Sequence, residues 1–104
     1  MRYVAAAKVK DVKPGRIRGV RLRGGYELAI ANVDGRLFAF QTYCPHQGWP
    51  LTWGAIDDGT IVCALHLWRF DPATGQVVDP PEADCLEVYP VTVEGDQVIV
   101  GLPD

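Results

Sequence analysis

The stretch CPHQGWPLTWGAIDDGTIVCALHLW, residues 44–68, holds two of the three cysteines and both histidines of this 104-residue chain. A histidine closely follows each cysteine: His46 comes two positions after Cys44, and His66 comes three positions after Cys63. Such a pairing rarely arises twice by chance, so the four residues indicate one shared site. The rest of the fold must then serve as a scaffold that brings these two short segments together.

Three kinds of site use these residue types. A tetrahedral zinc site takes two thiolates and two imidazoles, but structural zinc sites usually take both cysteines from one loop. A Cys–His nucleophile would leave one of the two pairs unused. A [2Fe–2S] cluster in which two histidines replace two cysteines on one iron uses all four residues, and each loop then gives one ligand to each iron. A zinc-stabilised module for protein contacts stays open as the alternative of a different class.

Outward from this stretch, the chain reads as short strands separated by turns. Apolar alternation and β-branched runs predict strands at 2–6, 16–22, 26–32, 36–42, 60–64, 67–70, 86–93 and 97–101. Glycine beside Asp, Pro, Thr or a second Gly predicts turns at 13–15, 24–25, 34–35, 58–59, 74–75 and 95–96. The only helix-like stretch, 5–12, is too short to be convincing. Many short strands predict an all-β, antiparallel sandwich or small barrel.

Residues 42–85 differ from the rest of the chain, because they contain five of its eight prolines and longer segments between the predicted strands. Stiff loops carried on a β scaffold are a common location for functional sites. At 104 residues the chain is long enough for one domain with its own core, so we expect a single domain over 1–104.

Composition narrows the function classes. Ten basic and thirteen acidic residues give a net charge of −3, which disfavours nucleic-acid binding. The arginines of 16–25 alternate with apolar residues, as on the solvated face of a strand. No apolar run approaches the roughly 20 residues of a membrane span, and the first residues lack the features of a signal peptide. With an odd number of cysteines, we expect a cytoplasmic protein without disulfides.

The motif C-x-H-x16-C-x-x-H resembles that of Rieske proteins. CPHQ (44–47), Gly54, HLWRF (66–70) and CLEVYPVTVEGD (85–96) are similar to the small Rieske ferredoxins of bacterial multicomponent toluene and aromatic monooxygenases. The resemblance implies an antiparallel β-sandwich with an inserted cluster-binding subdomain at about 42–82. It also implies one Rieske-type [2Fe–2S] cluster per chain, with Cys44 and Cys63 on the buried iron and His46 and His66 on the outer one.

The same resemblance implies a one-electron carrier that is not itself an enzyme. It would take electrons from an NADH-dependent flavin and iron–sulfur reductase and pass them, as a monomer, to the di-iron hydroxylase of an aromatic-hydrocarbon monooxygenase. A ring-hydroxylating dioxygenase, or the role of a small nitrite reductase subunit, is the alternative. Leu67 favours the monooxygenase, since many relatives of the other systems have glycine after the second ligand histidine.

The resemblance also bears on the reduction potential. Trp49 and Leu65 stand where high-potential Rieske proteins have a pair of disulfide-bonded cysteines, and Trp68 and Phe70 stand where those proteins have a serine and a tyrosine that donate hydrogen bonds. Fewer donors mean a less stabilised reduced cluster, so we expect a potential near the bottom of the Rieske range.

Residues around the four ligands are predicted to form the wall and rim of the site: Pro45, Gln47, Trp49, Leu65, Leu67, Trp68, Pro80 and Pro81. Trp49 is expected to favour surface contact, and Trp68 suits core packing and partner docking equally well. Five acidic residues could form a collar that steers a basic partner: Asp57, Asp58, Asp79, Glu82 and Asp84. Cys85 begins a predicted strand and is expected to be a buried, non-ligating residue.

Overall fold

The central strand of the protein is buried on both faces. In the computed structural model, which describes residues 1–45, 48–64, 67–79 and 85–103, the five consecutive residues 28–32 of β3 (Glu27–Val33) are all buried. Because successive strand residues point to opposite faces, Leu28 and Ile30 enter one core while Ala29 and Ala31 enter another. This explains why the segment reads as a continuous apolar run, with its smaller residues on one side.

Eleven antiparallel strands occur in the described parts of the chain, together with three short 3₁₀ turns. They are β1 (Arg2–Lys8), η1 (Val9–Asp11), β2 (Ile17–Arg21), η2 (Arg23–Gly25), β3 (Glu27–Val33), β4 (Arg36–Phe40), η3 (Leu51–Trp53), β5 (Ala55–Asp57), β6 (Thr60–Val62), β7 (Arg69–Phe70), β8 (Val77–Asp79), β9 (Val88–Tyr89), β10 (Val91–Glu94) and β11 (Gln97–Leu102). The all-β, antiparallel fold predicted from the sequence is confirmed.

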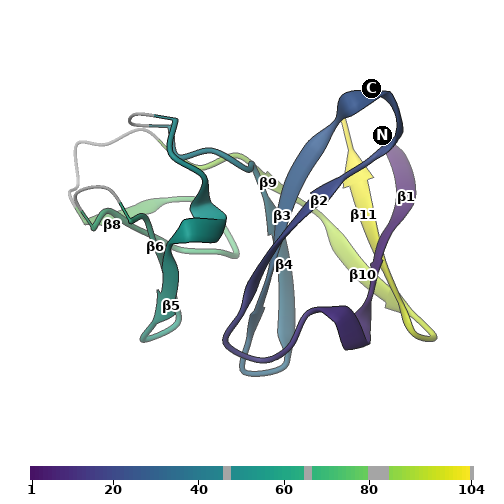
Figure 1. Cartoon of the computed structure of the whole chain (residues 1–104), viewed down its shortest axis with the longest axis horizontal. Helices are drawn as coiled ribbons and strands as arrows, with labels where there is room; N and C mark the ends of the chain where they lie inside the picture. The colour runs from purple at the N-terminus through teal and green to yellow at the C-terminus, as the bar shows by residue number, and fades with distance from the viewer. Residues whose placement is uncertain (46–47, 65–66, 80–84, 104) are drawn as a thin grey trace.

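The strands form three sheets. A sheet in the order β2-β3-β4-β9 packs on a second sheet in the order β1-β11-β10. Together they form the sandwich in the right half of Figure 1. The core between them consists of Val12, Leu28, Ile30, Ala39, Val98, Val100 and Leu102. Both ends of the chain lie at the upper edge of this sandwich (Figure 1), away from the inserted segment.

The inserted segment forms a third sheet of its own, in the order β5-β6-β7-β8, at the left of Figure 1. Its residues 55–79 fall within the range 42–82 that was predicted for the insertion. A second core joins this unit to β3 and β4 and consists of Ala29, Ala31, Phe40, Cys44, Leu51, Ile61, Cys63, Phe70 and Leu86. The two cysteines of the motif therefore lie in the core beneath the inserted sheet.

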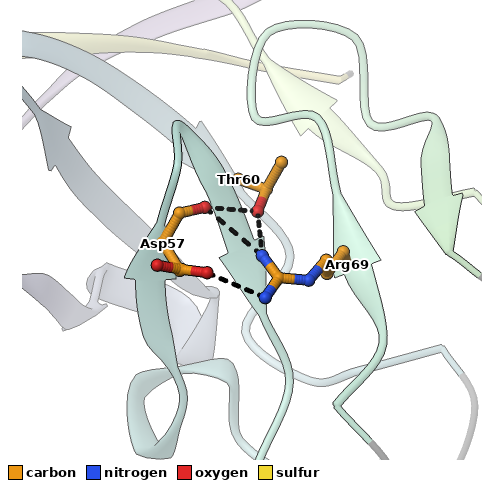
Figure 2. A network of polar contacts seen from close by, with 3 residues as sticks. All are labelled: Asp57, Thr60 and Arg69. Carbon is orange, nitrogen blue, oxygen red and sulfur yellow. Dashed lines mark hydrogen bonds and ion pairs between the residues drawn. The ribbon is translucent and has the colours of Figure 1, made fainter.

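Arg69 ties the inserted sheet together (Figure 2). Its guanidinium contacts Asp57 Oδ2 at 2.8 Å and donates to the Thr60 hydroxyl at 3.1 Å and to the Asp57 carbonyl oxygen at 3.4 Å. The Thr60 hydroxyl donates in turn to the Asp57 carbonyl oxygen at 2.6 Å. One cation thus links β7 to both strands of the β5–β6 hairpin, and Asp57 serves the sheet and is not left unpaired in an acidic collar.

Several predicted strand boundaries are wrong. β5 and β8 were not predicted, and the predicted strand 86–93 is split at Pro90 into β9 and β10, which belong to different sheets. Proline has no N–H to donate to a ladder, so the chain changes sheet there. The helix-like stretch 5–12 is the end of β1 followed by η1. The predicted turns are confirmed by left-handed backbone at Gly15, Gly24, Gly25, Gly35, Gly59, Gly75 and Gly95.

No helix within the described ranges has the length and apolar character needed to cross a membrane.

Candidate metal centre

The two cysteines of the motif begin loops that close in the same way. The backbone N–H of Cys44 donates to the carbonyl oxygen of Trp49 at 2.8 Å, and that of Cys63 donates to the carbonyl oxygen of Trp68 at 2.8 Å. Each cysteine therefore sits at the base of a six-residue loop whose last residue is a tryptophan. The motif histidines, His46 and His66, fall within these two loops in sequence but outside the residues that the structure describes.

The loops also share an unusual backbone position. The residue just before each tryptophan adopts left-handed dihedral angles, Gly48 with φ 74° and Leu67 with φ 56°. Glycine takes this conformation without penalty, whereas a leucine is strained in it. The two cysteine loops thus share their closing hydrogen bond and this left-handed position, which in the second loop is held by a strained leucine. The predicted strand 67–70 therefore begins only at Arg69, and Arg69 and Phe70 are the residues that pair with β6.

The two thiols are buried and lie in one apolar core. Cys44 is 3% exposed and Cys63 is fully buried, and neither is in a disulfide. Thiolates in a common apolar environment are the ligands that iron–sulfur clusters take from proteins, so these two residues fit such a cluster. Within the described ranges no three His, Cys, Asp or Glu side chains gather as a metal site. The histidines of the predicted set lie outside those ranges.

Residues that precede and follow the first loop pair with each other and so hold its two ends together. Leu51, fully buried, donates its N–H to the carbonyl oxygen of Thr42 at 2.8 Å, and Tyr43 forms a β-bridge with Pro50. At Gly54 the backbone after η3 lies directly against β6. A Cβ added there would lie 1.9 Å from the carbonyl oxygen of Val62, so only glycine permits this approach. Val62 directly precedes Cys63, so this close approach sets the spacing between the two cysteine segments.

Sequence reasoning missed Gln41, which connects the first loop to the segment after the insertion. Its side-chain carbonyl accepts from the N–H of Glu87 at 2.7 Å, and its amide donates to the carbonyl oxygen of Tyr43 at 2.6 Å. Its backbone N–H also donates to the carbonyl oxygen of Glu87 at 2.9 Å. Only the pairing of segments 46 positions apart makes this role visible. No local sequence pattern could have indicated it.

A polar network lies beside Cys44. The Arg21 guanidinium donates to Glu27 Oε1 at 2.6 Å, and the Tyr43 hydroxyl donates to Glu27 Oε2 at 3.0 Å. The hydrogen bond from Arg21, followed by that from Tyr43, lowers the pKa of Glu27. Donation to Glu27 raises the pKa of Tyr43. These groups line a hollow of about 270 Å³ between β2 and η3.

The predicted wall residues divide into core and surface. Trp68 is half-buried and packs against Phe70 with ring centroids 6.5 Å apart, so it belongs largely to the core beneath the second loop. Trp49 is 39% exposed, as expected for a surface contact. Four predicted wall residues lie outside the described ranges: Gln47, Leu65, Pro80 and Pro81. Of the predicted acidic collar, Asp58 is exposed, and the side chains of Asp79, Glu82 and Asp84 are not among those described.

The expectation for Cys85 is wrong, because this residue is exposed. The buried position belongs to Leu86, which is 3% exposed and packs in the core with both motif cysteines. Cys85 and Glu87 flank it on the outside, as in extended backbone where neighbouring side chains point in opposite directions.

This difference predicts selective alkylation. Iodoacetamide added to the native protein should modify one cysteine, Cys85, because only an accessible thiol can react. Intact-mass spectrometry should show a single adduct, a second experiment under denaturing conditions with a chelator should show three, and Cys85→Ser should remove the native adduct. Modification of Cys44 or Cys63 in the native protein would contradict their burial.

Comparison with known proteins decides the family. The Rieske [2Fe–2S] domain model matches residues 2–90 of the chain. The protein belongs to the Rieske [2Fe–2S] family. Its cofactor is therefore a [2Fe–2S] cluster, and the zinc-module alternative is not retained. The all-β, antiparallel Rieske fold expected from the resemblance, a sandwich with an inserted sheet, is confirmed.

Relatives of this Rieske protein are ferredoxins of oxygenase systems. The biphenyl dioxygenase ferredoxin subunit of Pseudomonas sp. (strain KKS102) is 41% identical over 101 residues, covering 96% of this chain and 92% of the relative. The ferredoxin component of the Xanthobacter autotrophicus alkene monooxygenase system is 33% identical over 100 residues, covering 95% and 80%. The solved Sphingomonas yanoikuyae B1 ferredoxin is 33% identical with a TM-score of 0.88, covering 98% of this chain and all of that one. The chain is a Rieske-type ferredoxin, an electron carrier and not an enzyme in its own right.

Proposed function

We propose that this ferredoxin carries single electrons to the oxygenase component of a multicomponent system that acts on aromatic hydrocarbons. The observation that supports it best is the 41% identity to the biphenyl dioxygenase ferredoxin subunit across nearly the whole of both chains. One Rieske domain over 1–104 would suffice for this role. Its electron donor would be an NADH-dependent flavin reductase, and it would work as a monomer in the cytoplasm.

Four residues are proposed as the cluster ligands. Cys44 and Cys63 would supply the two thiolates from the core, and His46 and His66 would supply the imidazoles from the loops above them. When bound, the cluster accepts and releases one electron without a change of ligands. The chain supports this chemistry by holding Cys44 and Cys63 at the bases of two matched loops and by burying both in an apolar core that includes Leu51.

The oxygenase is proposed to be a ring-hydroxylating dioxygenase, the system for which the 41% identical relative is named. A monooxygenase is the second candidate. It is supported by the alkene monooxygenase ferredoxin at 33% identity and by Leu67 in the position where many dioxygenase ferredoxins have glycine. In either case the substrate would be selected by the oxygenase, because the ferredoxin delivers only electrons.

Reconstitution distinguishes the two. NADH, a Rieske ferredoxin reductase and this ferredoxin would be combined either with a biphenyl-type dioxygenase or with a di-iron hydroxylase, and hydroxylated product would be measured by chromatography. Product that depends on the ferredoxin with the dioxygenase, at a rate well above that with the hydroxylase, supports the first proposal. The reverse order of rates would favour the monooxygenase, and no product in either system would contradict electron delivery to oxygenases.

The reduction potential should lie toward the lower end of the Rieske range of about −150 to +300 mV. Phe70 is fully buried and Trp68 is half-buried, and neither side chain has a hydroxyl that could donate a hydrogen bond at the second loop. A titration followed by visible absorbance, with a midpoint above about +100 mV, would contradict this expectation.

A further inference from the structure

Three large apolar side chains are exposed on segments that flank the candidate metal centre. Trp53 and Leu67 are each 66% exposed, and Trp49 is 39% exposed. They come from η3, the second loop and the first loop respectively. The rings of Trp49 and Trp53 meet edge to face with centroids 5.7 Å apart, so Trp53 is held in place on the surface. We call Trp49, Trp53 and Leu67 together the aromatic ridge, after its two tryptophans.

A shallow apolar hollow is lined by Trp53 on one segment and by Leu67 on another. It measures about 220 Å³ and is lined by Trp53, Gly54, Ala55, Val62, Cys63, Ala64 and Leu67. None of these side chains is charged, so the hollow would accept an apolar group without leaving a buried charge unpaired. A cavity somewhat smaller than this holds benzene in another protein, so the size suits a single aliphatic or aromatic side chain.

A second hollow beside Trp53 contains charged and hydroxyl groups. Trp53 also lines the hollow of about 270 Å³ that contains Arg21, Glu27 and Tyr43. An apolar centre beside a rim of Tyr and Arg is the composition in which binding energy concentrates at protein interfaces. The ridge therefore has both parts of a docking surface, next to Cys63, one of the two proposed thiolate ligands.

The backbone at Leu67 gives an independent indication. A glycine would hold φ 56° without strain, as Gly48 does at the matching position of the first loop. Leucine costs stability there, and its side chain gains no burial in return, because two thirds of it is exposed. A strained residue whose side chain adds nothing to the core is explained if that side chain contacts a partner.

We propose that the aromatic ridge is the surface on which the oxygenase component docks, with an apolar side chain of the oxygenase seated in the hollow between Trp53 and Leu67. This inference rests on the proposed function and specifies its acceptor-binding surface. The hollow shares Cys63 with the candidate metal centre, so a partner seated there would lie close to the proposed cluster. Three side chains bury too little area for a stable dimer of this chain but suit the small, short-lived interfaces of redox proteins.

Steady-state turnover of the reconstituted system with varied ferredoxin concentration tests the proposal. Trp53→Gln should raise the KM for ferredoxin about tenfold or more, since it removes a central aromatic contact, while kcat at saturation changes little. Leu67→Gly should raise the KM severalfold and yet give a protein at least as heat-stable as the wild type, because it relieves the strained backbone. Trp53→Phe should restore most of the affinity.

The matched control is Tyr3→Gln, because Tyr3 is a similarly exposed aromatic residue, 60% against 66% for Trp53, on β1 in the sandwich. It should leave the KM unchanged. All variants should keep the wild-type iron content and midpoint potential, so that a weaker interaction is not confused with a damaged cluster. Wild-type KM values for Trp53→Gln and Leu67→Gly would overturn the proposal, and so would an equal rise for Tyr3→Gln.

Two further outcomes separate this inference from the proposed function. If the wild type supports turnover and the ridge variants slow only reduction by the reductase, the ridge binds the electron donor, and docking of the oxygenase there is wrong. If the wild type transfers no electrons to any oxygenase, the proposed function fails and the inference fails with it. Turnover by the wild type with unaffected variants overturns the inference alone.

Discussion

Cys63→Ser will yield a protein that lacks the full complement of two irons and two sulfides per chain. Cys63 is completely buried and its backbone is fixed by the bond to Trp68, so no other thiol can move into its position. A serine hydroxyl is a poor substitute for thiolate as a ligand of soft iron–sulfur centres. Because metal binding contributes to folding free energy, the variant should also melt at a lower temperature. Colorimetric iron and sulfide assays and thermal unfolding measure both effects.

Cys85→Ser is the matched control for this substitution. Cys85 is exposed and lies outside the two loops, so its serine variant should contain wild-type amounts of iron and sulfide. Full iron content in Cys63→Ser, or loss of iron in Cys85→Ser, would contradict the assignment of the ligand cysteines.

Gly54→Ala will destabilise the fold more than Gly59→Ala, a substitution in the β5–β6 turn of the same sheet. An added Cβ would lie 1.9 Å from the carbonyl oxygen of Val62 and 3.2 Å from that of Leu51, and both contacts are with backbone that cannot rotate away. The two segments must separate, at a cost of about 3 kcal/mol. For a domain of this size the cost corresponds to roughly 15 °C in Tm. The shift would also displace the segment that carries Cys63, so faster loss of visible absorbance should accompany it.

Gly59→Ala provides the comparison. Gly59, in the β5–β6 turn, has left-handed backbone with φ 76° but open space around its Cα, so alanine there suffers conformational strain without a collision. Its cost should be about 1 kcal/mol. Calorimetric scans of the cluster-loaded proteins at one scan rate would compare the two variants. Equal Tm values for Gly54→Ala and Gly59→Ala would show that the close approach to β6 is not rigid.

The strands of the sandwich could be predicted because each carries its own pattern. β3 is a continuous apolar run because each of its faces packs in a hydrophobic core. The turns around it contain glycine where the backbone is left-handed. In the insertion, by contrast, β5 and β8 have three residues each, and the segments around them lack the continuous apolar run that marks β6. These strands exist because β6 and β7 offer edges for pairing, and that is tertiary information.

The candidate site also combines features that the sequence indicated with features that only the structure shows. Residue identity and spacing indicated the four ligands, since the chemistry of the cluster limits the choice of side chains. The sequence did not indicate that both loops follow one backbone plan, with Gly48 and Leu67 in equivalent left-handed positions. Nor did it indicate the exposure of Cys85. Neighbouring residues of an extended segment face opposite sides, so when Leu86 faces the core, Cys85 faces outward.

Pulsed EPR on the dithionite-reduced ferredoxin, prepared with and without ¹⁵N-histidine, tests the central claim most directly. His46 and His66 are the only histidines in the chain, so the labelled nitrogens report on these two residues alone. The account predicts two directly bound nitrogens, both with couplings that change on labelling, in a protein with two irons and two sulfides. A cluster with no bound histidine nitrogen, or with only one, would contradict ligation by Cys44, His46, Cys63 and His66.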